Sequence, residues 1–254
     1  DRSVATPMIE NLKLPKEEDQ GGDSKLTAKQ RKFIENLPYR SIIGCLLYVN
    51  VCTMPSITYA VSALGKFNCK PTLRACQALV RLCKFVYNER HRGITLGGKS
   101  PRLVSFADSD WGGDIDTRKS RSGSINFLGN GPVVWFSKMQ SLTAQSTMEA
   151  ELISCAPCVQ NIQFIRNVIN HANIPGISFK YASTLYEDNK SAMEVIQNPI
   201  HHQRSKHIHM KYQYVMDVVK SGTVVLDYIK SENNVADVFT KSVGKNAFKR
   251  HLDT

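Results

Sequence analysis

The feature that most constrains the fold is a glycine-flanked turn between two β-rich runs. Residues 122–128 and 133–138 are rich in strand-forming side chains, and Gly129-Asn130-Gly131 separates them. Glycine and asparagine accept the backbone angles of a tight turn, so this pattern is a strong signal for a β-hairpin. Residues 102–110, just upstream, alternate in the manner of a strand. The chain is therefore expected to contain three consecutive strands.

Helix-like and strand-like segments alternate after this hairpin. We expect, in order, a long helix at about 143–172 with a kink at Pro157, a strand at 184–187, a helix after Asp188, a helix at about 205–221, a strand at 223–230 and a final helix opening near 232–234. The order β-β-β-α-β-α-α-β-α predicts an α/β fold in which five strands form one mixed sheet.

The segment upstream of residue 100 has a different, helical character. Helical spacing begins near Tyr39, is interrupted at Pro55, and resumes over 57–67 and from Pro71 to about Glu89. On the last of these helices we expect an apolar stripe formed by Leu73, Cys76, Leu79, Val80, Cys83 and Val86. The predicted organisation is an extended or disordered lead-in (1–37), a basic helical segment (38–100), an α/β domain (101–245) and a tail (246–254).

The positive charge of the chain is concentrated in the helical segment. The formal net charge is +11, and residues 41–101 hold eight basic residues but only one acidic residue, Glu89. Such a surplus favours polyanionic partners. With so few carboxylates, this segment cannot carry metal chemistry alone. The carboxylates are concentrated after residue 101, where 14 acidic residues stand against 17 basic ones.

Membrane proteins and disulfide-stabilised secreted proteins are both disfavoured. The longest apolar run, 42–49, is too short to span a bilayer, and the polar residues 1–40 contain no secretory signal. Asp1 in place of Met suggests a fragment or a processed product.

Seven cysteines in such a chain do not indicate a disulfide framework. Cys155 and Cys158 have redox or zinc spacing, but no second pair completes a metal site, so we favour buried small hydrophobes.

Four acidic positions fall where this order of elements would bring them together. Asp108 lies on the first strand, Glu149 or Glu151 opens the long helix, Asp188 ends the fourth strand, and Asp237 lies in the last helix. Hard cations such as Mg²⁺ prefer oxygen ligands, and two of them roughly 3.5–4 Å apart activate water and stabilise the leaving oxygen of a phosphodiester. A lone carboxylate is more often a solvated charge, whereas the four together favour a metal site.

Helical phase chooses between the two glutamates, which point to opposite sides at about 3.6 residues per turn. In phase with Glu151 are the apolar residues Cys155, Cys158, Ile162, Ile165 and Ile169. In phase with Glu149 are Ile153, Ala156, Gln160, Gln163 and Asn167, which grow polar. The apolar side must face inward, so Glu151 is the expected ligand.

Several basic and aromatic residues are candidates for nucleic-acid contact. The basic ones are Arg118, Lys119 and Arg121 before the hairpin strand, and Lys206, His207 and Lys211 on the helix at 205–221. Such side chains suit a phosphate backbone, with a solvated turn or helix face as an equal alternative.

The cluster of His201, His202, His207 and His209 lacks a partner of zinc-finger spacing. Trp111 and Trp135 either stack on bases or fill the core, and we favour the core.

Six motifs in these regions resemble one protein family. They are Phe106-Ala-Asp-Ser-Asp-Trp-Gly-Gly113, Arg118-Lys-Ser-Arg-Ser-Gly123, Ser146-Thr-Met-Glu-Ala-Glu-Leu152, Tyr186-Glu-Asp-Asn-Lys-Ser191, Ser205-Lys-His-Ile208 and Val235-Ala-Asp-Val-Phe-Thr-Lys241. In this order they resemble the ribonuclease H domain of Copia-type (Ty1/Copia, Pseudoviridae) retrotransposon Pol polyproteins. Tyr39-Arg-Ser-Ile-Ile-Gly44 and Ile57-Thr-Tyr-Ala-Val61 resemble the segment that joins the reverse transcriptase to that domain.

The resemblance implies a ribonuclease H-like mixed five-stranded sheet with flanking helices. It also implies an endonuclease that hydrolyses the RNA strand of RNA–DNA hybrids with two Mg²⁺ (or Mn²⁺) ions during reverse transcription. Position by position, it assigns the catalytic metal ligands to Asp108, Glu151, Asp188 and Asp237. Its implied partners are the hybrid and the rest of the Pol reverse transcriptase, with no membrane and no small-molecule cofactor. The implied location is a cytoplasmic virus-like particle, with the nucleus as a second location.

The sequence departs from the family pattern at three places. His209 stands where an acidic residue is frequent, Ser56 stands where aspartate is common, and residues 230–234 lack the histidine that bacterial-type enzymes carry before the last aspartate. The polymerase motif Tyr-x-Asp-Asp is absent, so we expect no DNA synthesis.

Two other functions remain open. One is a catalytically degenerate nucleic-acid-binding remnant of a Pol polyprotein. The other is a strand-transfer enzyme of related fold, which uses two aspartates and a late glutamate. The early position of Glu151 and the presence of a fourth carboxylate argue against strand transfer.

Overall fold

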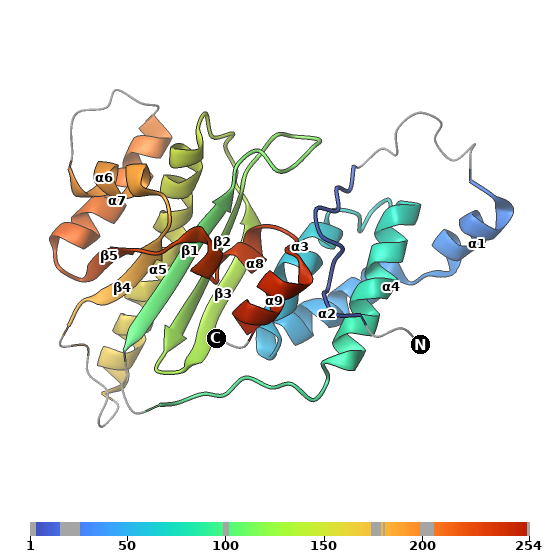
Figure 1. Ribbon diagram of the computed structural model, residues 1–254, viewed down its shortest axis with the longest axis horizontal. Helices are drawn as coiled ribbons and strands as arrows, with labels where there is room; N and C mark the ends of the chain where they lie inside the picture. Colours follow the sequence, from blue (N-terminus) through green and yellow to red (C-terminus); the bar gives the residue numbers. More distant parts are fainter. Residues whose placement is uncertain are drawn as a thin grey trace. The chain divides into compact units, whose positions relative to one another are not determined.

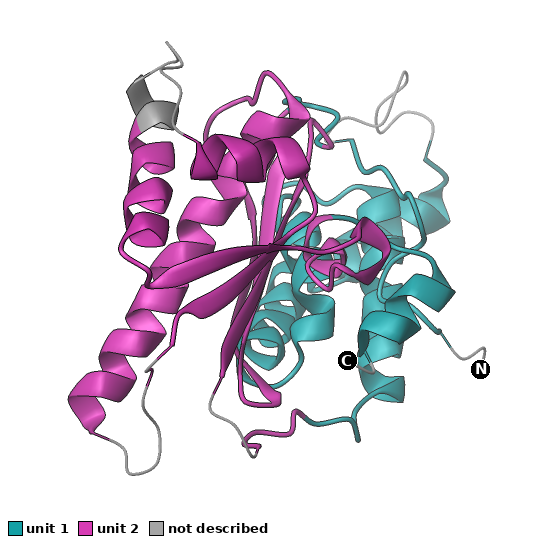
Figure 2. Ribbon diagram, turned by 60° about the vertical axis from the view of Figure 1, so that its left-hand side comes forward, with its two compact units in different colours: residues 1–93, 114–118, 241–254 teal, residues 94–113, 119–240 magenta. Residues whose placement is uncertain are grey.

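The computed structural model describes residues 4–15, 26–98, 102–173, 179, 181–198 and 206–252 of the 254, and the side chains of 206–209 lie outside this description. The chain forms two compact units (Figure 2). One contains residues 1–93, 114–118 and 241–254, and the other contains residues 94–113 and 119–240. No helix in the described ranges has the length and apolar character required to cross a membrane.

The first unit is helical (Figure 1). Its helices are α1 (Ala28–Asn36), α2 (Tyr39–Cys52), α3 (Thr58–Gly65), α4 (Leu73–Asn88) and α9 (Lys245–Leu252), with a 3-10 turn at Pro55–Ile57. The three expected helices between residues 39 and 89 are confirmed. Thr72 begins α4 by accepting a hydrogen bond from the backbone N–H of Ala75.

The structure has helices in two segments of this unit where no helix was expected. The segments 1–37 and 246–254, expected as a disordered or extended lead-in and a tail, contain α1 and most of α9. Thr27 starts α1 with a capping box to Gln30, a signal present in the sequence. Phe248 of α9 is buried and meets the ring of Phe85 edge to face at 5.6 Å. That tertiary contact explains why a short basic segment forms a helix.

The buried face of α4 is also rotated from the expected stripe. The fully buried side chains of this helix are Ala75, Cys76, Ala78, Leu79, Leu82 and Phe85. Of the six expected residues only Cys76 and Leu79 are among them, because large side chains at Leu82 and Phe85 set the inward direction.

The second unit is built on one five-stranded sheet. Its strands are β1 (Leu103–Asp110), β2 (Arg121–Leu128), β3 (Gly131–Met139), β4 (Ser183–Glu187) and β5 (Val224–Tyr228), in the order β3-β2-β1-β4-β5. The pairs β1–β2 and β2–β3 are antiparallel, and β1–β4 and β4–β5 are parallel. The expected mixed five-stranded sheet is therefore confirmed.

The turn between β2 and β3 requires glycine at two positions. Gly129 has a φ of +63°, a region that favours glycine. A Cβ on Gly131 would lie 2.5 Å from the carbonyl oxygen of Thr95, so only glycine fits.

Helices cover both faces of the sheet. They are α5 (Thr147–Ala172), α6 (Lys190–Gln197), α7 (Lys206–Lys220) and the short α8 (Asp237–Thr240). Leu103 and Ala107 of β1 pack in one core with α5, α6 and α7, while Phe106 packs in another with Phe239 of α8. Since alternate side chains of a strand point to opposite faces, the two cores lie on opposite faces.

The long helix α5 runs without a break through Pro157. Its inward stripe is as expected, because Cys155, Cys158, Ile162, Ile165 and Ile169 are all buried. All seven cysteines are free thiols, and Cys155 and Cys158 are buried small side chains as we favoured.

Candidate metal centre

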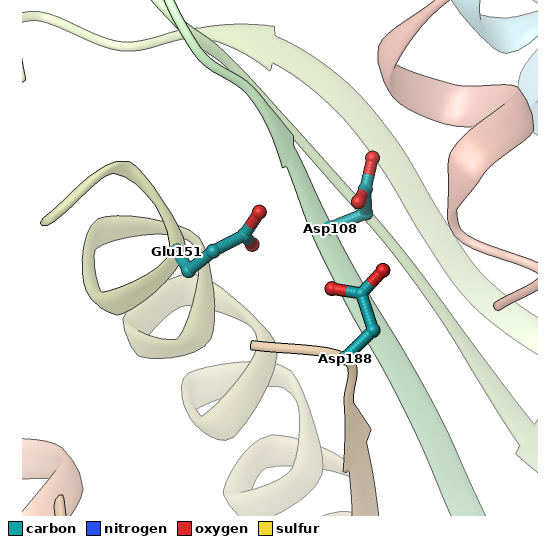
Figure 3. A group of neighbouring side chains, drawn as sticks. All are labelled: Asp108, Glu151 and Asp188. Carbon is teal, nitrogen blue, oxygen red and sulfur yellow. The ribbon is translucent and has the colours of Figure 1, made fainter. Parts of the chain in front are cut away.

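Three carboxylates converge at one end of the sheet (Figure 3). Asp108 comes from β1, Glu151 from the start of α5, and Asp188 directly follows β4; one oxygen of each lies within 4.8 Å of the others. The parallel pairing of β1 with β4 aligns Val104 with Thr184. Continued along the strands, this register brings position 108 level with 188. Three carboxylate oxygens at such spacing suit a hard divalent cation.

Glu149 and Glu151 have different roles because they point to different sides of α5. Both are buried, but the Oε2 atom of Glu149 accepts a hydrogen bond from the backbone N–H of Gln145 at 2.5 Å. Ser146 accepts from the backbone N–H of Glu149 at 3.2 Å. Glu149 is thus part of the N-terminal cap of α5, while Glu151 joins the carboxylate cluster.

Burial and mutual repulsion make it unfavourable for all the carboxylates of this cluster to be charged. Burial raises the pKa of Glu151 well above its usual value, and the negative charges of Glu187, Asp108 and Asp188 raise it further. Such repulsion is what a bound divalent cation would relieve, so the donor set fits a metal ion.

Glu187 is a fourth carboxylate beside these three, and it was not among the residues expected there. It is fully buried at the end of β4, where burial and the neighbouring charge of Asp188 raise its pKa to about 8. The Cys155 thiol donates to its Oε2 atom at 3.3 Å, and the backbone N–H of Asn189 donates to its Oε1 atom at 3.2 Å. Strand alternation was the available signal, because it places Glu187 on the face of Leu185.

The segment leading into α8 packs beside Asp108. Asn234, fully buried, donates from Nδ2 to the carbonyl oxygen of Ala107 at 2.9 Å. Thr240, also fully buried, donates its hydroxyl to Oδ2 of Asp108. Asp237 opens α8 and is partly buried, but it is not one of the three carboxylates that meet within 4.8 Å.

We expect Thr240 to orient Asp108. Thr240→Val keeps the shape but removes the donor, so Mn²⁺ affinity should fall about 10–100-fold, the usual effect of losing a partner of a metal ligand. Thr240→Ser should retain most of the affinity. Calorimetric Mn²⁺ titration measures both, with the unfolding temperature in EDTA as the control for folding. Equal Mn²⁺ affinity in all three proteins would contradict this role.

The six basic candidates do not form one described cluster. Arg118 is exposed and has a φ of +55°, and Lys119 is partly exposed. Arg121 is buried within β2, where it donates to Oγ of Ser137 at 3.3 Å. Lys211 of α7 is partly exposed. Lys206 and His207 begin α7, but their side chains lie outside the described residues.

The histidine cluster and the two tryptophans were also candidates for binding. His201 and His202 fall outside the described ranges, and so does the side chain of His209. Trp135 packs in the core with Phe106, as we favoured, whereas Trp111 is 52% exposed and donates to the carbonyl oxygen of Ala144 at 3.1 Å.

The chain is similar in sequence to the Pol polyproteins of plant transposons. The Pol polyprotein of transposon RE1 of Arabidopsis thaliana is 33% identical over 249 residues, which cover 98% of this chain and 16% of the relative. That of transposon TNT 1-94 of Nicotiana tabacum is 29% identical over 248 residues, covering 98% and 18%. The chain thus spans less than a fifth of the length of these relatives. No protein-family model matches the chain.

Solved structures also resemble it. LC11 ribonuclease H1, isolated from compost, is 12% identical with a TM-score of 0.41, covering 60% of this chain and 99% of that one. The foamy viral protease-reverse transcriptase in complex with dsDNA is 12% identical with a TM-score of 0.46, covering 81% and 42%.

The motifs, the sheet order and these relatives agree. The six motifs occur within the region matched by the plant transposon relatives, and the mixed sheet is the one their resemblance implied. The chain belongs to the family of Copia-type retrotransposon Pol polyproteins.

Proposed function

We propose that this chain hydrolyses the RNA strand of RNA–DNA hybrids with the help of two divalent cations. The observation that carries the proposal is the convergence of Asp108, Glu151 and Asp188 at the ends of β1 and β4. Membership of the family supports it. LC11 ribonuclease H1, one of the structural neighbours, has also been solved in complex with an RNA/DNA hybrid.

In this proposal the chain's own residues hold and orient the ions. Asp108, Glu151 and Asp188 supply the charged oxygens, Asp237 is assigned as a further ligand, and Thr240 fixes the Asp108 carboxylate. When bound, Mg²⁺ or Mn²⁺ ions would activate a water and stabilise the leaving oxygen of the phosphodiester. We assign the remainder of a Pol reverse transcriptase as a partner and a virus-like particle as the location; nothing described favours a nuclear location.

The test is cleavage of three matched duplexes by the purified chain. We expect RNA to be cut in the RNA–DNA hybrid only, and only with Mg²⁺ or Mn²⁺, while RNA–RNA and DNA–DNA duplexes stay intact. Hybrid binding without cleavage would instead identify a degenerate binding remnant. Cleavage of DNA alone would indicate a strand-transfer enzyme.

Metal binding should also stabilise the fold. A cation that binds only the folded chain, present at 100 times its Kd, adds about 2.7 kcal/mol, or roughly 5–10 °C in unfolding temperature for a domain of this size. The measurement is thermal unfolding in Mg²⁺ or Mn²⁺ against NaCl of equal ionic strength. The shift should be lost in Asp188→Asn, and an equal shift in that variant would argue against the site.

The basic helical segment is assigned to affinity rather than chemistry. Lys70 and Lys84 are exposed there, and we expect Lys70→Gln with Lys84→Gln to weaken hybrid binding. For every phosphate that is no longer neutralised, the slope of log affinity against log salt should become shallower by about 0.9. Fluorescence anisotropy over a salt series measures this slope. An unchanged slope in the double variant would refute the role of these lysines.

A further inference from the structure

A cavity of about 500 Å³ lies within the second unit, and none of the three carboxylates lines it. It is lined by Ser122, Phe136, Lys138, Met139, Gln140, Ser141, Ile153, Ala156, Pro157, Gln160, Asn161, Met210, Lys211 and Tyr214. Its walls come from β2 and β3, one side of α5 and the first half of α7. The volume is in the range of small-ligand sites.

The charge of the described lining is entirely positive. Lys138 and Lys211 are its charged residues, and the lining named above includes no carboxylate. Among the described residues, neither lysine has an ion-pair partner. Two ammonium groups without a counter-charge at one cavity favour an anionic ligand, and phosphate is the anion a nucleic acid supplies.

The polar lining supports a ligand rather than a packed wall. The side chains of Gln160 and Asn161 of α5 make no hydrogen bond with a described residue, and both line the cavity, Gln160 exposed and Asn161 partly exposed. Gln140 is only 5% exposed; its Nε2 atom donates to Ser122 and to the carbonyl oxygen of Ala150, but its Oε1 atom has no donor among the described residues. Because that oxygen is itself buried, the amides left to pair with a ligand in the cavity are those of Gln160 and Asn161.

The apolar lining offers surfaces for a planar group. Phe136 and Lys138 point to the same face of β3, because they are two residues apart. Tyr214 contributes a second ring, and its hydroxyl is held by Oε1 of Gln163 at 2.5 Å. Aromatic faces next to positive charge are how proteins hold single-stranded bases and their phosphates.

We propose that this cavity binds one unpaired nucleotide, with its phosphate at Lys138 and Lys211 and its base against the apolar wall beside Phe136. An unpaired position of a nucleic-acid strand is the source we favour over a free mononucleotide, because a strand supplies further phosphates to a chain of net charge +11. The inference extends the proposed function, but the binding itself needs neither metal nor cleavage.

The experiment measures binding of fluorescent hexathymidylate to the full chain in EDTA. We expect Lys138→Gln and Lys211→Gln each to lower affinity about 3–10-fold, and the double variant at least about 10-fold. The salt slope should become shallower by about 0.7 for each phosphate that is no longer bound. Phe136→Leu keeps an apolar side chain but removes the ring, and should lower affinity about five-fold or more.

The matched control is Lys220→Gln, since Lys220 is exposed on the same helix α7 but does not line the cavity. It should change affinity less than about two-fold. Hexathymidylate binding that survives the double variant, or that falls equally in the control, overturns the site. Competition by thymidine monophosphate as effective as by the unlabelled hexamer assigns the cavity to free nucleotides and overturns the strand as source. Because no cleavage is measured, a negative result here leaves the nuclease test intact, and the reverse also holds.

Discussion

Asp108→Asn and Asp188→Asn are each expected to lower hydrolysis of RNA in a hybrid by at least about 10³-fold. Each variant replaces a charged oxygen of the cluster by a neutral amide, which holds Mg²⁺ poorly. A loss of ~4 kcal/mol of charge stabilisation in the transition state corresponds to this factor. The measurement is single-turnover cleavage of a labelled hybrid in Mg²⁺, repeated in Mn²⁺.

The folds of these variants should remain intact or gain stability in EDTA. Removing one negative charge relieves the repulsion that raises the pKa of Glu151, and in Asp108→Asn the amide oxygen can still accept from Thr240. Asp227→Asn is the matched control, because Asp227 is an exposed aspartate on β5. It should cleave at the rate of the parent chain. Parent-like activity in Asp108→Asn or Asp188→Asn would remove the basis of the proposed function.

The parts of the fold that were predictable follow local rules. Strand alternation and the Gly129-Asn130 turn predicted the β2–β3 hairpin, and the 3.6-residue period predicted the inward stripe of α5. Both signals are carried by a few consecutive residues, so no tertiary information is needed to interpret them.

The parts that were missed depend on interactions between residues distant in sequence. The segment 114–118 lies between β1 and β2 in sequence, but it groups with the helical unit, where Lys66 binds Asp114 at 2.7 Å and also pairs with Asp116. Neither composition nor period reveals such a pairing. The same reason applies to α9, whose burial depends on Phe85.

The candidate site shows the same division. Strand ends and helix phase placed Asp108, Glu151 and Asp188, because these positions depend on element order and period. Thr240 was not predicted, since its hydroxyl reaches Asp108 across 132 residues of sequence. Arg121 was expected at the surface, but it lies within β2, which begins one residue earlier than the expected start at residue 122.

Substituting each of the two glutamates at the start of α5 distinguishes a metal ligand from a helix cap. Glu151→Gln should lower hybrid cleavage by about 10²–10³-fold, because it removes one charged oxygen from the metal cluster. Glu149→Gln should leave the cleavage rate within about three-fold of the parent. The amide oxygen can still accept from Gln145, and only the favourable charge at the helix N-terminus is removed, a cost of about 0.3–1 kcal/mol in the free energy of unfolding.

The pair is measured by kcat/KM on the hybrid and by unfolding in EDTA. Glu151→Gln should lose activity without losing stability, since burial and repulsion disfavour its charge in the metal-free chain. Glu149→Gln should lose a little stability without losing activity. The two variants have the same chemistry, lie two residues apart on one helix and are both buried, so general damage to α5 would affect them alike. Activity that disappears in Glu149→Gln and persists in Glu151→Gln would show that α5 presents its other side to the metal ions.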